Sequence, residues 1–213
     1  MSVRPLFRIL LTLVGLFGAS IAYAAPDKPV EIDGAFLDYL DSPEYWAIIR
    51  QRTVELEPPP LAAACPSVTP LRRQGWSPVE YPRWSREKHQ ALFGTWIERV
   101  VVDRCGEIGL RRLQVIARPM GDLLISGLVP GGFLGNLRLE FDTKPMVAKA
   151  AMAATDCDDL RSVYVIDTRV IDLPVNGLWH ERWTVIACGT PDILDLYFKA
   201  DKKGATASLT PFP

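Results

Sequence analysis

One thirteen-residue pattern occurs twice in the chain, at residues 94–106 and 177–189. Both copies read G-x-W-x-E-R-x-x-V-x-x-C-G, and they align without a gap. The matched positions include Trp and Cys, which are among the rarest amino acids, so composition alone does not explain the agreement. The constant offset of 83 residues indicates that the chain contains two related structural units.

Each copy of the repeat has the composition of a β-strand, with aromatic and β-branched residues throughout and three valines in a row at residues 100–102. Because alternate residues of a strand share a face, we expect Trp96, Glu98 and Val100 on one face. Ile97 and Arg99 are then expected on the other. The Gly after each Cys predicts a turn, and further strands are predicted at 110–117 and 123–129 and at the equivalent positions 193–200 and 205–209.

The rest of the chain predicts a few helices and additional strands. Asp33 and Ser42 are placed to cap two short helices, and the run of prolines at 58–60 ends the second one. Residues 66–85, rich in Pro and Trp, are predicted as an ordered loop or edge segment, and residues 85–93 as one or two helical turns. Strands are predicted at 136–141 and 163–173, with a helix between them that Thr143 caps.

These elements predict a mainly β (α+β) fold, in which two duplicated, disulfide-stapled meander units form antiparallel sheet. We assign residues 1–24 to a signal peptide, 25–60 to an N-terminal helical appendage with a Pro-rich linker, 61–142 to unit one and 143–213 to unit two. Each unit alone offers few strands, so the two are expected to share one core. The appendage has no evident counterpart before unit two. It is expected to pack on the sheet as a lid, and a partner-docking helix is the alternative.

The N-terminus has the features of a secretory signal peptide. Arg4 and Arg8 precede an apolar run at residues 9–21, and Ala22-Tyr23-Ala24 is a small-x-small cleavage site. We therefore expect cleavage after Ala24, a periplasmic or secreted protein, and no integral membrane span in the mature chain. A non-cleaved anchor is the alternative.

The mature chain is expected to carry slightly more acid than base. Without Arg4 and Arg8 it has 22 Lys and Arg against 25 Asp and Glu, and no basic block. Nucleic acid is therefore a poor candidate partner, because phosphate binding requires clustered positive charge. An unknown envelope protein or a glycan remains the expected partner.

All four cysteines lie in the exported part, and an even number there predicts two disulfides. Cys105 and Cys188 occupy the same repeat position, and each has one Cys upstream, so symmetry favours Cys65–Cys105 and Cys157–Cys188. The rival pairing joins Cys105 to Cys188 across the units. With no C-x-x-C pair and two histidines, the sequence predicts no metal site, and it suggests no cofactor.

The repeat carries two equivalent carboxylates, Glu98 and Glu181, which are weak candidates for an acid/base pair of the kind used in glycoside hydrolysis. The alternative is structural: each Glu pairs with an Arg on a neighbouring strand and helps to set the register. A duplicated motif is more typical of duplicated structure, so the structural alternative is favoured.

Three aromatic residues among the prolines, Trp76, Tyr81 and Trp84, are candidates for a ligand surface. They are less obviously part of a core than the Trp residues of the repeat, whose strand positions are typical of core residues.

The segment 179–189, with the pattern W-x-E-x-W-x-V-x-x-C-G, is followed by Phe198, Asp201 and Gly204. This stretch of about forty C-terminal residues resembles the end of small exported Gram-negative proteins of unknown function. The resemblance implies a secreted β-domain and implies no activity or site.

The function expected from the sequence is a non-enzymatic binding or assembly module of the cell envelope. The sequence does not decide whether the protein is an enzyme, although no recognisable catalytic set is present. Two alternatives remain: a periplasmic inhibitor of a hydrolase, acting through a rigid loop at 66–85, and a glycan or cell-wall hydrolase that uses Glu98 and Glu181.

Overall fold

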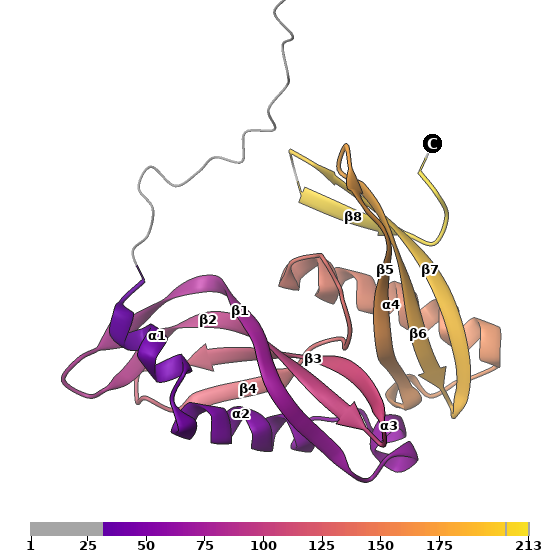
Figure 1. Ribbon diagram of the computed structural model, residues 1–213. Helices are drawn as coiled ribbons and strands as arrows, with labels where there is room; N and C mark the ends of the chain where they lie inside the picture. Colours follow the sequence, from indigo (N-terminus) through magenta and orange to yellow (C-terminus); the bar gives the residue numbers. More distant parts are fainter. Residues whose placement is uncertain (1–31, 203, 213) are drawn as a thin grey trace, which may run out of the picture. The chain divides into compact units, whose positions relative to one another are not determined.

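The computed structural model describes residues 32–202 and 204–212 of the chain. The predicted signal peptide and its cleavage site lie outside the described residues. The described part is mainly β, because its strands form two four-stranded antiparallel sheets accompanied by a few helices (Figure 1). This confirms the predicted fold class.

The first half is a helical segment followed by a four-stranded meander. Its elements are α1 (Gly34–Leu40), α2 (Pro43–Glu55), α3 (Pro59–Ala64), β1 (Val68–Ser85), β2 (Gln90–Arg104), β3 (Glu107–Ala117) and β4 (Leu123–Gly127). Each strand pairs with its neighbour in sequence, so the sheet order is β1-β2-β3-β4. The predicted caps are confirmed: the side chain of Asp33 accepts from the N–H of Ala35, and that of Ser42 from the N–H of Tyr45.

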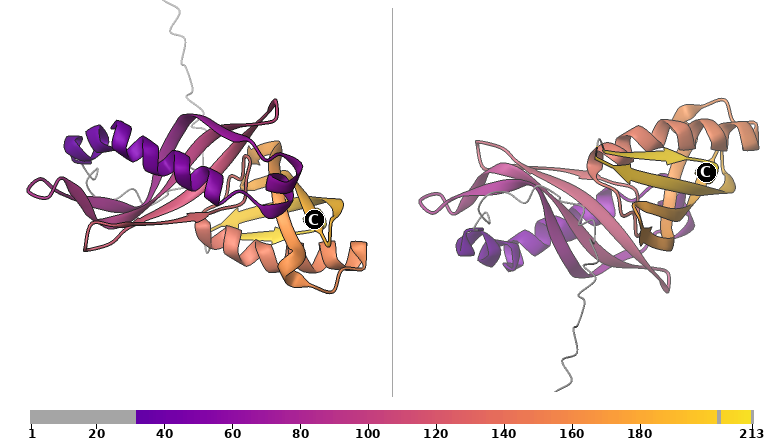
Figure 2. Two further views of the ribbon diagram at one scale, coloured as in Figure 1. Left: turned by 90° about the horizontal axis from the view of Figure 1, so that it is seen from below. Right: turned by 90° about the horizontal axis from the view of Figure 1, so that it is seen from above.

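The second half repeats this order of helix and meander. Its elements are α4 (Leu137–Thr155), the 3₁₀ turn η1 (Leu160–Ser162), β5 (Val163–Val175), β6 (Leu178–Ala187), β7 (Thr190–Asp201) and β8 (Gly204–Ser208). The sheet order is again sequential, β5-β6-β7-β8. Figures 1 and 2 show α2 along one face of the first sheet and α4 along one face of the second.

The Cys-Gly pair that ends each repeat forms a two-residue hairpin turn. Arg104 pairs with Glu107 across the first turn, and Ala187 pairs with Thr190 across the second. Both turn residues have positive φ, 53° and 95° in the first turn and 48° and 82° in the second. This is the geometry of the type I′ turn, which matches the twist of the paired strands and favours Gly at its second position.

A disulfide holds each of these turns to the segment that enters the sheet. Cys65, directly after α3, is bonded to Cys105, and Cys157, after α4, is bonded to Cys188. These are the within-unit pairs that the symmetry of the repeat favours. Each helix-and-sheet half is therefore closed by its own covalent link.

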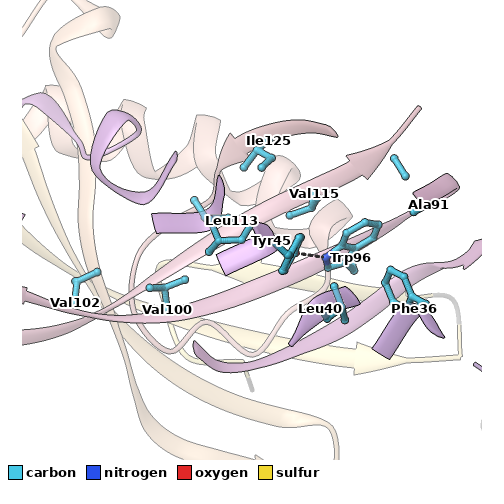
Figure 3. Packing of buried hydrophobic residues seen from close by; sticks show 12 residues of the cluster. Phe36, Leu40, Tyr45, Ala91, Trp96, Val100, Val102, Leu113, Val115 and Ile125 are labelled. Carbon is cyan, nitrogen blue, oxygen red and sulfur yellow. Dashed lines mark hydrogen bonds between the residues drawn. The ribbon is translucent and has the colours of Figure 1, made fainter. Parts of the chain in front are cut away.

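The buried residues form two main clusters, one in each half, and a small third cluster of Ile97, Leu128 and Leu137. The first lies between α1, α2 and the first sheet, and Figure 3 shows Trp96 within it, hydrogen-bonded to Tyr45. The second is built around Trp183 and Phe198, beneath α4. Phe36 and Leu40 are in the first cluster, which confirms that the N-terminal helices pack on the sheet as a lid.

The N-terminal helical segment has a counterpart, contrary to the prediction. Helix α2 precedes the first sheet as α4 precedes the second. The sequence concealed this equivalence because the two helices differ in length and share no motif. As a result, the predicted boundary after residue 142 falls inside α4.

Two local predictions are also wrong. Residues 85–93 are not helical, because Ser85 and Gln90 pair across the β1–β2 hairpin and His89 has a φ of 49°. Residues 136–141 are not a strand, because Asn136 caps α4 by accepting from the N–H of Leu139. The alternation of apolar residues there is short, and the buried positions of the whole segment recur every three or four residues, as in a helix.

Candidate functional site

Glu98 is fully buried on the inner face of β2. Its carboxylate accepts from the hydroxyl of Tyr45 on α2 at 2.8 Å and from Nε and Nη2 of Arg73 on β1, both at 3.1 Å. Burial raises the pKa of Glu98 above its ordinary value, although Arg73 and Tyr45 act in the opposite direction. Glu98 thus has the Arg partner on a neighbouring strand that the structural alternative predicts.

Glu181 occupies the equivalent position on β6 but has different partners. Its carboxylate accepts three N–H bonds, from the indoles of Trp179 at 2.9 Å and Trp183 at 3.0 Å and from the backbone of Leu134 at 3.0 Å. Burial raises its pKa, while these bonds and the nearby charge of Arg112 lower it. The predicted Arg on a neighbouring strand is replaced here by indole and backbone donors.

The structure does not bring Glu98 and Glu181 together. The two carboxylates have no hydrogen-bonding partner in common, and each lies beside a different core cluster. An acid/base pair requires two carboxyl groups facing one substrate across a distance of roughly 5–9.5 Å. Both residues instead satisfy polar groups inside the protein, which is a structural role.

Two of the three predicted surface aromatics belong to the packing of the first half. Trp76 makes an edge contact with Phe36 at 5.5 Å between ring centroids, and Trp84 packs on Tyr39 at 5.1 Å. Tyr81 alone is well exposed, at 44% of its surface. The three therefore do not form one ligand surface.

The least expected polar residues are two adjacent arginines on β3. Arg111 and Arg112 are each only 1% exposed. Arg111 pairs with Glu57, with 3.1 Å between Nε and Oε2, and Glu57 also pairs with Arg104. Burial lowers the pKa of Arg111 to about 10, so it remains a cation at neutral pH.

Arg112 points to the opposite face of β3 from Arg111 and reaches α4. Its Nη1 donates to Oε2 of Glu140 at 2.9 Å, and its guanidinium lies over the ring of Phe133 at 5.2 Å from the centroid. Its Nε is buried without a hydrogen-bond partner. The sequence analysis missed this arrangement, because a charged residue in a strand pattern is ordinarily taken as solvent-exposed.

Arg112 lines a cavity of about 640 Å³, which we call the arginine cavity. Its walls are the outer face of the first sheet, which bears Ile97, Arg99 and Leu110, and the segment from Gly131 to Arg138 that leads into α4. The cavity is thus built on the strand face opposite to Trp96 and Glu98. Its size lies within the range of small-molecule sites.

A second cavity of about 460 Å³ has mostly apolar walls from β4, α4 and β5, with Arg111 and Lys144 as its charged members. Neither cavity is lined by Glu98 or Glu181. Within residues 32–202 and 204–212, no group of three or more His, Cys, Asp or Glu side chains is arranged to hold a metal.

No helix among the described residues combines the length and the apolar character that crossing a membrane requires.

Comparison with protein-family models, with curated proteins and with solved structures finds no significant match to this chain.

Proposed function

We propose that the protein is a non-enzymatic binding module that is exported to the cell envelope. The arginine cavity is the observation that carries the proposal, because it combines about 640 Å³ of space, partly apolar walls and a small number of charged groups. Sites for small molecules typically have this composition.

The repeat supports a binding role over a catalytic one. Its two carboxylates are buried, one in each half of the fold, and both already accept hydrogen bonds from protein groups. A hydrolase that uses Glu98 and Glu181 would need both to reach one substrate.

Export is supported by the two disulfides, since such bonds persist in oxidising compartments. The inhibitor hypothesis loses its main support, because the segment expected to protrude is largely strand β1, paired along its length with β2.

Native mass spectrometry of the protein recovered from the periplasm tests the proposal. A ligand held in the cavity adds a defined mass to the native ion, and denaturation removes that mass. In parallel, the protein is assayed for release of soluble fragments from peptidoglycan. We expect no turnover by the wild type. Turnover that disappears in Glu98→Gln or Glu181→Gln, with the variant still folded, would refute a non-enzymatic function.

A further inference from the structure

The two sheets differ in the charge of the residue that faces the conserved arginine of the repeat. Arg99 on β2 and Arg182 on β6 are the same residue of the repeat, 83 residues apart. In the second sheet the residue directly opposite Arg182 is Asp195, and Nε of Arg182 lies 3.0 Å from Oδ1 of Asp195. In the first sheet the residue opposite Arg99 is Arg112. Like charges that face each other across two strands destabilise a sheet unless something neutralises them.

The protein groups around Arg99 and Arg112 do not supply full neutralisation. Arg99 donates to the neutral hydroxyl of Ser77 at 3.3 Å, and Glu140 is shared between Arg112 and Lys144. Arg99, Arg112 and Lys144 carry three positive charges. The carboxylates near them are those of Glu140 and Glu181, so one positive charge is not balanced even when Glu181 is ionised.

The Nε of Arg112 is a buried donor that has no acceptor among the protein groups. Arg112 is almost completely buried, and a buried guanidinium N–H without an acceptor is costly to the protein. Arg112 and Arg99 both line the arginine cavity. Helix α4, which begins at Leu137 on the wall of the same cavity, adds the positive end of its dipole.

The remaining wall is partly apolar, and its polar members are Ser77, Asn136 and Arg138. Ile97, Leu110, Phe133 and Leu134 line the cavity beside the two arginines. A bare inorganic anion would neutralise the charge but would leave these side chains facing water.

We propose that the arginine cavity binds a small organic anion, whose carboxylate is held by Arg99 and Arg112 and whose apolar body contacts Ile97, Leu110 and Phe133. This inference rests on the proposed binding function and names its ligand class. Arginine suits the role because its planar fork matches the geometry of a carboxylate. The equivalent place in the second sheet cannot bind such an anion, because Arg182 already forms an ion pair with Asp195.

Isothermal titration of the full mature chain with octanoate tests the proposal. Octanoate carries one carboxylate on an apolar chain small enough for the cavity. The test variant is Arg99→Gln, because Arg99 is partly exposed and its loss removes a repulsion, so the ligand-free variant should melt no lower than the wild type. The matched control is Arg182→Gln, which removes the same residue of the repeat from the second sheet.

We expect one octanoate per chain for the wild type and for Arg182→Gln. Affinity should fall roughly ten- to a hundredfold in Arg99→Gln, which corresponds to the loss of one hydrogen-bonded charge. Arg99→Lys keeps the charge without the fork and should give an intermediate affinity. It also supplies a second test if the Gln variant folds poorly.

Three results would overturn the proposal: equal octanoate binding by the wild type and Arg99→Gln, no octanoate binding by the wild type, or inorganic phosphate binding as tightly as octanoate. The last would remove the requirement for an apolar body. A failure of the proposed function appears as glycan turnover in the peptidoglycan assay. None of the three results above involves turnover, so the two failures are distinguishable.

Discussion

Replacing Glu181 by Gln should lower the free energy of unfolding by about 2 kcal/mol. The carboxylate accepts from Trp179 and Leu134 at Oε1 and from Trp183 at Oε2. A Gln amide has a single acceptor oxygen, so it can keep the bonds of Trp179 and Leu134. Its NH₂ group then faces the indole N–H of Trp183, a donor against a donor.

The magnitude follows from two opposing effects. An unsatisfied buried donor costs about 1–3 kcal/mol, and the two remaining bonds lose the strengthening that an ionised acceptor gives. Burial of the charge acts the other way, because it raises the pKa of Glu181 and so already disfavours the ionised side chain. A net loss near the middle of the donor range is therefore expected.

Thermal unfolding monitored by circular dichroism measures this loss. For a chain of this size, about 2 kcal/mol corresponds to a decrease of roughly 4–8 °C in the melting temperature. Glu80→Gln, an exposed position on β1, is the control and should leave the melting temperature unchanged. A Glu181→Gln variant that melts like the wild type would refute the structural role of this carboxylate.

Two further predictions concern the same pair of buried carboxylates. Tyr45→Phe removes the hydroxyl that accepts from Trp96 and donates to Glu98, so it should cost about 1–3 kcal/mol of stability in denaturant unfolding, whereas Tyr81→Phe at an exposed site should cost nothing measurable. Because burial raises the pKa of Glu181, the native state holds a proton there more tightly than the unfolded chain does; this contribution to stability is present below about pH 4.5 and is lost as the pH rises through the raised pKa. The stability difference between the wild type and Glu181→Gln should therefore be larger near pH 4 than near pH 7, and a difference that grows with pH would contradict the direction of the shift.

The repeat allowed much of the sheet structure to be predicted. The alternation of residues along a strand places Trp96, Glu98 and Val100 on one buried face, and the offset of 83 residues predicts the same pattern on β6. The same symmetry favours the disulfides of the structure, because Cys105 and Cys188 each had one upstream partner. These features are local to the strands and their turns, where a period of two and a Gly after Cys are sufficient signals.

The helices were harder to predict because their pairing with the sheets depends on contacts far apart in the sequence. Leu137, Leu139 and Phe141 alternate like a strand, and only the cap at Asn136 and the buried Glu140 show that α4 starts there. For the same reason, α2 was predicted to belong to an appendage and not to be the partner of the first sheet.

The arginine cavity was missed because a charged residue in a strand is ordinarily taken as solvent-exposed. Arg112 is buried only because the segment before α4 folds over the outer face of the first sheet. One signal was available: aligning the repeats places Arg112 opposite Arg99 where the second unit has Asp195 opposite Arg182. The shared fold of the two copies does not by itself require the charge at this position to change sign.

Non-reducing peptide mapping of the protein recovered from the periplasm tests most directly whether this is an exported protein made of two separately closed halves. We expect a mature chain that begins at Ala25 and two linked peptide pairs, Cys65 with Cys105 and Cys157 with Cys188. A link between Cys105 and Cys188, or free thiols in a chain that keeps its first 24 residues, would contradict it.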